Sequence, residues 1–146
     1  MGAFLTPLRL ERIEDTSHDE RGTWRLIDPL MYRADRLNGA IICVPAGFIT
    51  DLASVPRVPV TWLMVGGIGH AAAVVHDWLY STQIFSKDIA DDVLYEALRA
   101  LKLPWWQCKL IYLGPHLFGQ HAWELDNQKQ PAEVVKLFPK QFEVRT

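Results

Sequence analysis

A change in hydrophobic period near residue 61 constrains the fold of this 146-residue chain more than any other feature. Before it, segments rich in branched and aromatic residues alternate with polar or proline-containing turns, as is typical of β-strands. After it, apolar residues recur at helical spacing. We therefore expect an α+β fold, with N-terminal β-strands and hairpins followed by an antiparallel helix hairpin and a third, kinked helix.

The β-rich part covers residues 1–60. Its apolar segments are FLTPLRLERI (4–13), TWRLIDPLMYRA (23–34) and the branched run at 41–44. The polar stretch EDTSHDERG between the first two predicts a hairpin turn. The prolines of SVPRVPV (54–60) predict a loop or an extended segment, because proline cannot donate to a ladder or continue a helix.

The helical part covers residues 61–126. GHAAAVVHDWLY predicts a first helix at about 69–81, and Ser86 followed by KDIAD predicts the start of a second. Pro104 opens a third helix, which the pair Gly114-Pro115 should kink or break.

The size and charge of the chain limit its class. Residues 1–146 suffice for one domain with a real core, and we expect 127–146 to form a tail packed on the body. The net charge is -2, with both signs scattered, so we expect no nucleic-acid partner. The first residues lack the pattern of a signal peptide, and no stretch approaches the ~18 to 20 uncharged apolar residues of a transmembrane segment.

The two cysteines, Cys43 and Cys108, form no metal-ligand pair and no disulfide framework. We interpret both as small buried apolar residues in a reducing compartment. One bridge between them is the alternative.

A histidine and an aspartate stand side by side in the apolar run AAAVVHDWLY (71–80). In an antiparallel hairpin, His76 and Asp91 are nearly equidistant from the connection, ~11 Å along each axis at 1.5 Å per residue. A carboxylate on one imidazole nitrogen would fix the tautomer and leave the other nitrogen as a general base. Tyr80, one turn after His76, is placed to reach Asp91.

Asp77 points about 100° away from His76, toward the segment that precedes the helix. Calcium prefers carboxylates and backbone carbonyls on a turn. The Asp51 carboxylate and the Leu52 carbonyl, or carbonyls of GGIG, would therefore join Asp77 in a hard-cation site. A carboxylate in so apolar a helix is costly unless it has a partner or an ion.

The same residues allow a structural interpretation. His76 would then be a satisfied core residue, Asp77 would pair with Arg57, and Asp91 would only stabilise the first turn of its helix.

Two further patterns point elsewhere. His70 and His76 resemble the histidines of metal-dependent phosphohydrolases, but residues six apart diverge by about 120° on a helix. Trp105 and Trp106 are residues that suit a lipid interface, although such a pair more often completes a core or a protein interface.

The stretch VPAGFITDLASVPR, followed by AAVVHDWLY and an Ala-Asp pair at 90–91, resembles a family from tailed phages and prophages that is known as a domain of unknown function. The resemblance covers roughly residues 40–120. It implies a phage or prophage origin, and therefore the host cytoplasm or the virion as location, but no established activity.

HDWLY followed by KDIADDVLYEAL is similar to the catalytic helix pair of secreted-type phospholipase A(2), especially its prokaryotic branch. This resemblance implies His76 as the base that activates water, Asp91 as the group that orients it and Tyr80 as a buttress for Asp91. It implies calcium bound by Asp77, Asp51 and the Leu52 carbonyl. The disulfides of that family have no counterpart here.

The residues and the resemblances together predict a calcium-dependent hydrolase that cleaves lipid or other esters. The competing prediction is a non-catalytic virion or tail-assembly protein that uses the same hairpin structurally and binds other phage proteins. A small metal-dependent hydrolase of another bond is the third.

Overall fold

The computed structural model describes residues 2–13, 23–50 and 69–129 of the chain. Its N-terminal part contains two three-stranded antiparallel sheets, with strand orders β1-β4-β5 and β2-β3-β6. The strands are β1 (Ala3–Phe4), β2 (Leu10–Ile13), β3 (Thr23–Leu26), β4 (Leu30–Ala34), β5 (Ala40–Val44) and β6 (Ile49–Thr50). The predicted hairpin joins β2 to β3, and its turn lies outside the described residues.

The strands follow the alternation of their side chains. Leu30, Tyr32 and Ala34 of β4 are buried, whereas Arg33 between them is exposed. Residues 23–34, which form one apolar segment in the sequence, make two strands because the chain bends at Asp28-Pro29, where proline has no N–H for a ladder. The 3-10 helix η1 (Asp35–Leu37) and Asn38, at φ 56°, connect β4 to β5.

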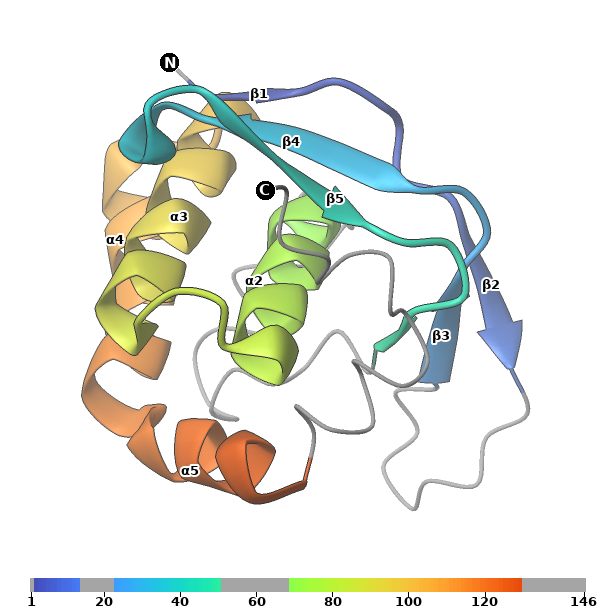
Figure 1. Ribbon diagram of the computed structural model, residues 1–146. Helices are drawn as coiled ribbons and strands as arrows, with labels where there is room; N and C mark the ends of the chain where they lie inside the picture. The colour runs from blue at the N-terminus through green and yellow to red at the C-terminus, as the bar shows by residue number, and fades with distance from the viewer. Residues whose placement is uncertain (1, 14–22, 51–68, 130–146) are drawn as a thin grey trace.

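Four helices follow: α2 (His70–Thr82), α3 (Lys87–Ala100), α4 (Trp105–Phe118) and α5 (Gln120–Lys129). Helix α2 is the centre of the molecule, and its residues 72–80 are all buried. A helix that is apolar on every side requires such a position. Figure 1 shows α2 beneath β5, with α3 and α4 on one side and the β2-β3 hairpin on the other.

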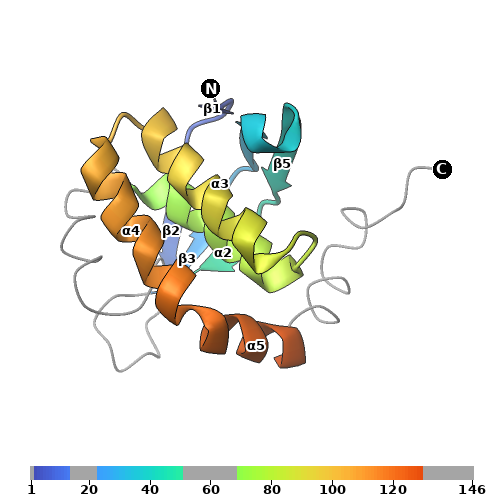
Figure 2. The same cartoon turned by 90° about the vertical axis from the view of Figure 1, so that its left-hand side faces the viewer.

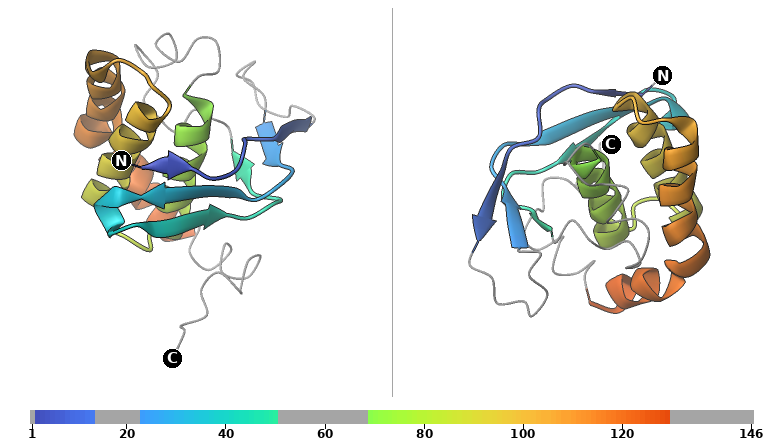
Figure 3. Two further views of the ribbon diagram at one scale, coloured as in Figure 1. Left: turned by 90° about the horizontal axis from the view of Figure 1, so that it is seen from above. Right: turned by 180° about the vertical axis from the view of Figure 1, so that it is seen from behind.

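The β1-β4-β5 sheet covers the helical layer. Seen from above, its three strands lie over α2 and α3 (Figure 3, left). Glu96 of α3 fixes this contact, because its carboxylate accepts hydrogen bonds from the Tyr32 hydroxyl at 2.6 Å and from the backbone N–H groups of Asp35 and Arg36 at 2.9 and 2.8 Å. The predicted α+β class, with strands before helices, is therefore confirmed.

The helix boundaries agree with the sequence except in the third helix. Ser86 caps α3, and its hydroxyl accepts the N–H of Ile89. Helix α4, in contrast, runs through Gly114-Pro115, and the change of direction falls at Gly119. The helix therefore does not break at Gly114-Pro115, and a kink at that point stays a prediction. Pro115 lies in the last turn of α4, where its missing N–H removes one hydrogen bond, and the Lys87 amine donates to the carbonyl groups of Pro115 and His116 nearby.

The structure also bears on the expectations for the two tryptophans, the tail, the cysteines and membrane spans. Trp105 and Trp106 are exposed, so they do not complete the core, and the alternatives of a protein interface and a lipid interface stay predictions. Residues 127–129 belong to α5, and the remainder of the predicted tail lies outside the described residues, as does the predicted loop at 54–60. Cys43 and Cys108 are free thiols whose pKa values burial raises. No described helix is long and apolar enough to cross a bilayer.

Candidate active site

His76 of α2 and Asp91 of α3 face each other across the helix pair. The Nε2 atom of His76 lies 2.9 Å from Oδ1 of Asp91, and both side chains have 0% of their surface exposed. The contact predicted from the equal distances of the two residues to the connection is confirmed. It depends only on an antiparallel hairpin and on the helical period.

Tyr80 completes this contact from one turn further along α2. Its hydroxyl donates to the same Oδ1 atom of Asp91 at 2.7 Å, as predicted. Its ring centroid lies 4.3 Å from that of the His76 ring. It lies 5.0 Å from that of the Trp123 ring, in an edge-to-face arrangement. The tyrosine therefore fixes both the imidazole and the carboxylate.

Lys87, the first residue of α3, is a partner that sequence reasoning missed. Its Nζ atom donates to Oδ2 of Asp91 at 2.9 Å, and to the carbonyl oxygens of Pro115 and His116 at 2.8 and 3.4 Å. A positive charge at a helix N-terminus opposes the helix dipole, so it indicates a specific partner. That position and the i, i+4 spacing from Asp91 were the available signals.

The surroundings keep Asp91 ionised. Burial would raise its pKa, but the hydrogen bonds that the carboxylate accepts, first from His76 and then from Lys87, outweigh burial. The pKa of Asp91 therefore lies below its ordinary value of 3.8. Because an ionised carboxylate can only accept hydrogen bonds, His76 carries its proton on Nε2.

The other ring nitrogen of His76 is the unusual atom of the site. Nδ1 is buried and has no hydrogen-bond partner among the described residues. With the proton on Nε2, Nδ1 presents a lone pair. A buried polar atom without a partner costs free energy, which is a reason to ask what it serves. Chemically, this nitrogen is able to accept a proton from water or from a substrate hydroxyl.

Asp77 points to a different part of the molecule, as predicted. Its Oδ2 atom accepts a hydrogen bond from the hydroxyl of Thr50, the last residue of β6, and both residues are buried. The two expected co-ligands, Asp51 and Leu52, follow Thr50 in the chain and lie outside the described residues, as does Arg57. Within the described ranges, no three His, Cys, Asp or Glu side chains gather as a metal site.

His70, the remaining candidate on α2, begins the helix and is half-buried, and burial lowers its pKa. It forms no part of the His76 network among the contacts of the described residues.

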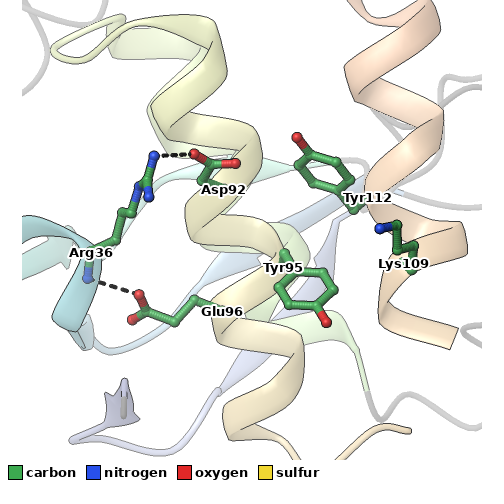
Figure 4. Close-up of a pocket in the computed structure, with 6 residues that line it drawn as sticks. All are labelled: Arg36, Asp92, Tyr95, Glu96, Lys109 and Tyr112. Atoms are coloured by element: carbon green, nitrogen blue, oxygen red, sulfur yellow. Dashed lines mark hydrogen bonds and ion pairs between the residues drawn. The ribbon is translucent and has the colours of Figure 1, made fainter. Parts of the chain in front are cut away.

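A cavity of about 460 Å³ lies on another side of α3 (Figure 4). It is lined by Arg36, Asp92, Tyr95, Glu96, Lys109 and Tyr112. The Arg36 guanidinium pairs with the Asp92 carboxylate at 2.6 Å, and the Arg36 backbone N–H donates to the Glu96 carboxylate. Asp92 thus faces this cavity, whereas the adjacent Asp91 faces His76. Sequence reasoning did not identify the cavity, because its residues come from three separate elements.

Comparison with known proteins adds a family but no activity. No curated protein and no solved structure matches the chain, so the similarity to phospholipase A(2) stays a prediction. A family model described as "Protein of unknown function (DUF1353)" matches residues 24–114, which include the His76 network and Asp77. Since the match spans more than half of the chain, the protein belongs to the DUF1353 family.

Proposed function

We propose that the protein is a hydrolase in which His76 removes a proton from a water molecule that attacks an ester. The observation that carries the proposal is the buried imidazole with one nitrogen on a carboxylate and the other, Nδ1, without a partner among the described residues. General bases are positioned in this way, with one nitrogen anchored and the other directed at the reaction.

In this mechanism Asp91 orients the ring and does not itself take the proton. As Nδ1 gains a proton, the ionised carboxylate stabilises the imidazolium that forms. Tyr80 and Lys87 hold the two carboxylate oxygens, at 2.7 and 2.9 Å, so that Asp91 cannot rotate away from the ring. These two are positioning residues, and removing either should reduce the rate less than removing His76.

Calcium is the cofactor that fits this proposal, with Asp77, Asp51 and the Leu52 carbonyl as its ligands. Oxygen donors suit a hard cation, and the Asp77 carboxylate and the Thr50 hydroxyl are both oxygen donors at the point where the chain enters residue 51. Bound there, calcium would polarise the ester carbonyl. Because His76 and Asp77 point about 100° apart on α2, the mechanism requires a substrate that reaches both the base and the ion.

The substrate we propose is a lipid ester, and the origin we propose is a tailed phage or prophage, with the host cytoplasm or the virion as location. The similarity of the HDWLY hairpin to secreted-type phospholipase A(2) supports the first, and the similarity of VPAGFITDLASVPR to a phage family supports the second.

The test is hydrolysis of a phospholipid and of a soluble short-chain ester, with and without calcium. We expect His76→Gln to lower the rate about 10²- to 10⁴-fold, the usual contribution of a general base. His121→Gln, an exposed histidine on α5, is the matched control and should keep full activity. If the folded wild-type protein cleaves neither ester, or if both variants are equally active, the proposal is wrong.

A non-catalytic role in the virion is the second candidate, and the complete burial of His76 and Asp91 favours it. The network would then be a polar core that fixes how α2 packs on α3. In that case His76→Gln and Asp91→Asn would lower the free energy of unfolding, and no ester would be cleaved under any condition.

A further inference from the structure

Helix α4 exposes an unusual amount of apolar surface. Four of its large apolar side chains are exposed: Trp105 by 63%, Trp106 by 50%, Leu110 by 45% and Leu117 by 61%. Single exposed apolar residues are common, but several on one short helix indicate an interaction surface. Figure 2 shows α4 on the outside of the helical layer, with α2 behind it.

The spacing of three of these residues makes them one surface, and Trp105 lies beside it, about 100° around the helix from Trp106. Trp106, Leu110 and Leu117, together with the half-buried Leu113, lie at i, i+4, i+11 and i+7, within an arc of about 60° on a helical wheel. The opposite side carries the buried residues Cys108 and Ile111. Helix α4 is therefore apolar on two sides, and only the inner one packs on α3.

Helix α4 and the chain on either side of it carry basic but no acidic residues. Residues 97–123 contain no aspartate or glutamate, although the whole chain has 17, and they contain Arg99, Lys102 and Lys109. Lys102 and Lys109 are exposed, and neither has a hydrogen bond or ion pair within the described part of the chain.

The carboxylates nearest to Lys109 belong to α3 and are already engaged. Figure 4 shows Lys109 at the cavity with Asp92, which pairs with the Arg36 guanidinium, and with Glu96, which accepts the Arg36 backbone N–H. Glu96 also accepts the Tyr32 hydroxyl. The ammonium group of Lys109 thus stays available to a ligand outside the protein.

We propose that this outer face of α4, made of Trp105, Trp106, Lys109, Leu110 and Leu117, docks onto the surface of an anionic membrane. The indole ring is suited to the interface, since its apolar body enters the acyl region while its N–H remains in the polar layer. Lysines beside an inserted apolar stripe are attracted to anionic headgroups.

A second copy of the chain is a poorer occupant of the same face. Two copies would bring Lys102 and Lys109 of one protomer near those of the other, and the face offers no carboxylate to pair with them. Like charges at an interface oppose association. An anionic lipid surface satisfies both the apolar stripe and the lysines.

The docking proposal rests on α4 and does not require hydrolysis. The test is therefore co-sedimentation of the full chain with vesicles of ether-linked lipids, which have no ester to cleave. Vesicles of equal parts phosphatidylglycerol and phosphatidylcholine should bind the protein, and vesicles of phosphatidylcholine alone should bind it at least tenfold less. High salt should weaken the binding, because headgroup attraction is screened.

Variants assign the binding to α4. We expect the double variant Trp106→Ser/Leu117→Ser to bind about tenfold less or weaker still, since each side chain would bury apolar surface in the bilayer. Lys102→Glu/Lys109→Glu should lose the preference for anionic vesicles. The controls are Ile41→Ser and Arg33→Glu, which change exposed residues of the β1-β4-β5 sheet.

Three results would overturn the proposal: no binding to the anionic vesicles, equal binding of the α4 variants and the controls, or a dimer that the Trp106→Ser/Leu117→Ser change dissociates in the absence of any vesicle binding. His76→Gln should bind vesicles as the wild type does. A wild-type protein that binds the vesicles but cleaves no ester would contradict the catalytic proposal alone, and one that cleaves an ester but binds no vesicles would contradict the docking proposal alone.

Discussion

The Tyr80 hydroxyl lies directly against Gly119, so that a Cβ atom added at Gly119 would fall 2.9 Å from the tyrosine oxygen. It would also clash with the carbonyl oxygen of Pro115. The corner between α4 and α5 is therefore in contact with a residue that orients Asp91. This corner and the His76 network form one packed unit, although their residues are far apart in the chain.

Gly119→Ala should move this corner away from Tyr80 and weaken the hydrogen bond between Tyr80 and Asp91. Forcing a methyl group into a packed site typically costs about 1–3 kcal/mol. Denaturant unfolding measures the cost. In a Tyr80→Phe background, which has no hydroxyl to displace, Gly119→Ala should cost less. Strictly additive effects of the two changes would show that the hydroxyl and the corner are not coupled.

Lys87→Met should destabilise the protein by about 1–3 kcal/mol, because it leaves one oxygen of a fully buried carboxylate without its donor. It also removes a hydrogen bond to each of two carbonyl groups at the end of α4, of which that of Pro115 keeps the Gly119 N–H as a donor. Lys102→Met, which changes an exposed lysine without such partners among the described residues, should alter the free energy of unfolding by no more than about 0.5 kcal/mol. Equal effects of the two changes in denaturant unfolding would argue against a structural role for Lys87.

The dependence of stability on pH should report on Asp91. Its pKa in the folded protein is below the ordinary 3.8, so its ionisation stabilises the fold at every pH above that value. This contribution is lost as the pH falls through the lower, folded pKa. The difference in unfolding free energy between the wild type and Asp91→Asn should thus be largest near neutral pH and shrink below about pH 4. A difference that stays constant from pH 7 to pH 2 would contradict the lowered pKa.

Contacts that depend only on local helix geometry could be predicted from the sequence. The pairing of His76 with Asp91 follows from two helices of known period joined by a short connection, and Tyr80 follows from the i+4 rule. Nothing in these arguments needs the rest of the fold. The burial of α2 follows equally from its own apolar composition.

Contacts between segments that are far apart in the chain could not be predicted from local helix geometry. The Lys87 amine donates to two carbonyl groups at the end of α4, 28 and 29 residues away in the chain. The hydrogen bond from Thr50 to Asp77 is a contact that the sequence did not suggest, whereas the predicted co-ligand Asp51 lies outside the described residues. Which residue of an extended segment faces a helix depends on strand register, and a shift of one residue reverses it.

Calcium should raise the thermal midpoint of the wild-type protein, since a ligand that binds only the folded state stabilises it by mass action. At a calcium concentration ten times the dissociation constant, the gain is about 1.4 kcal/mol. Asp77→Asn should abolish the shift while keeping a side-chain oxygen for the Thr50 hydroxyl, so the fold should persist. Asp88→Asn, in the exposed first turn of α3, is the matched control and should retain the shift. Equal shifts in the wild type, Asp77→Asn and Asp88→Asn would show that calcium binds at a site other than Asp77. If millimolar calcium shifts the midpoint of none of them, calcium has no part in the proposed mechanism.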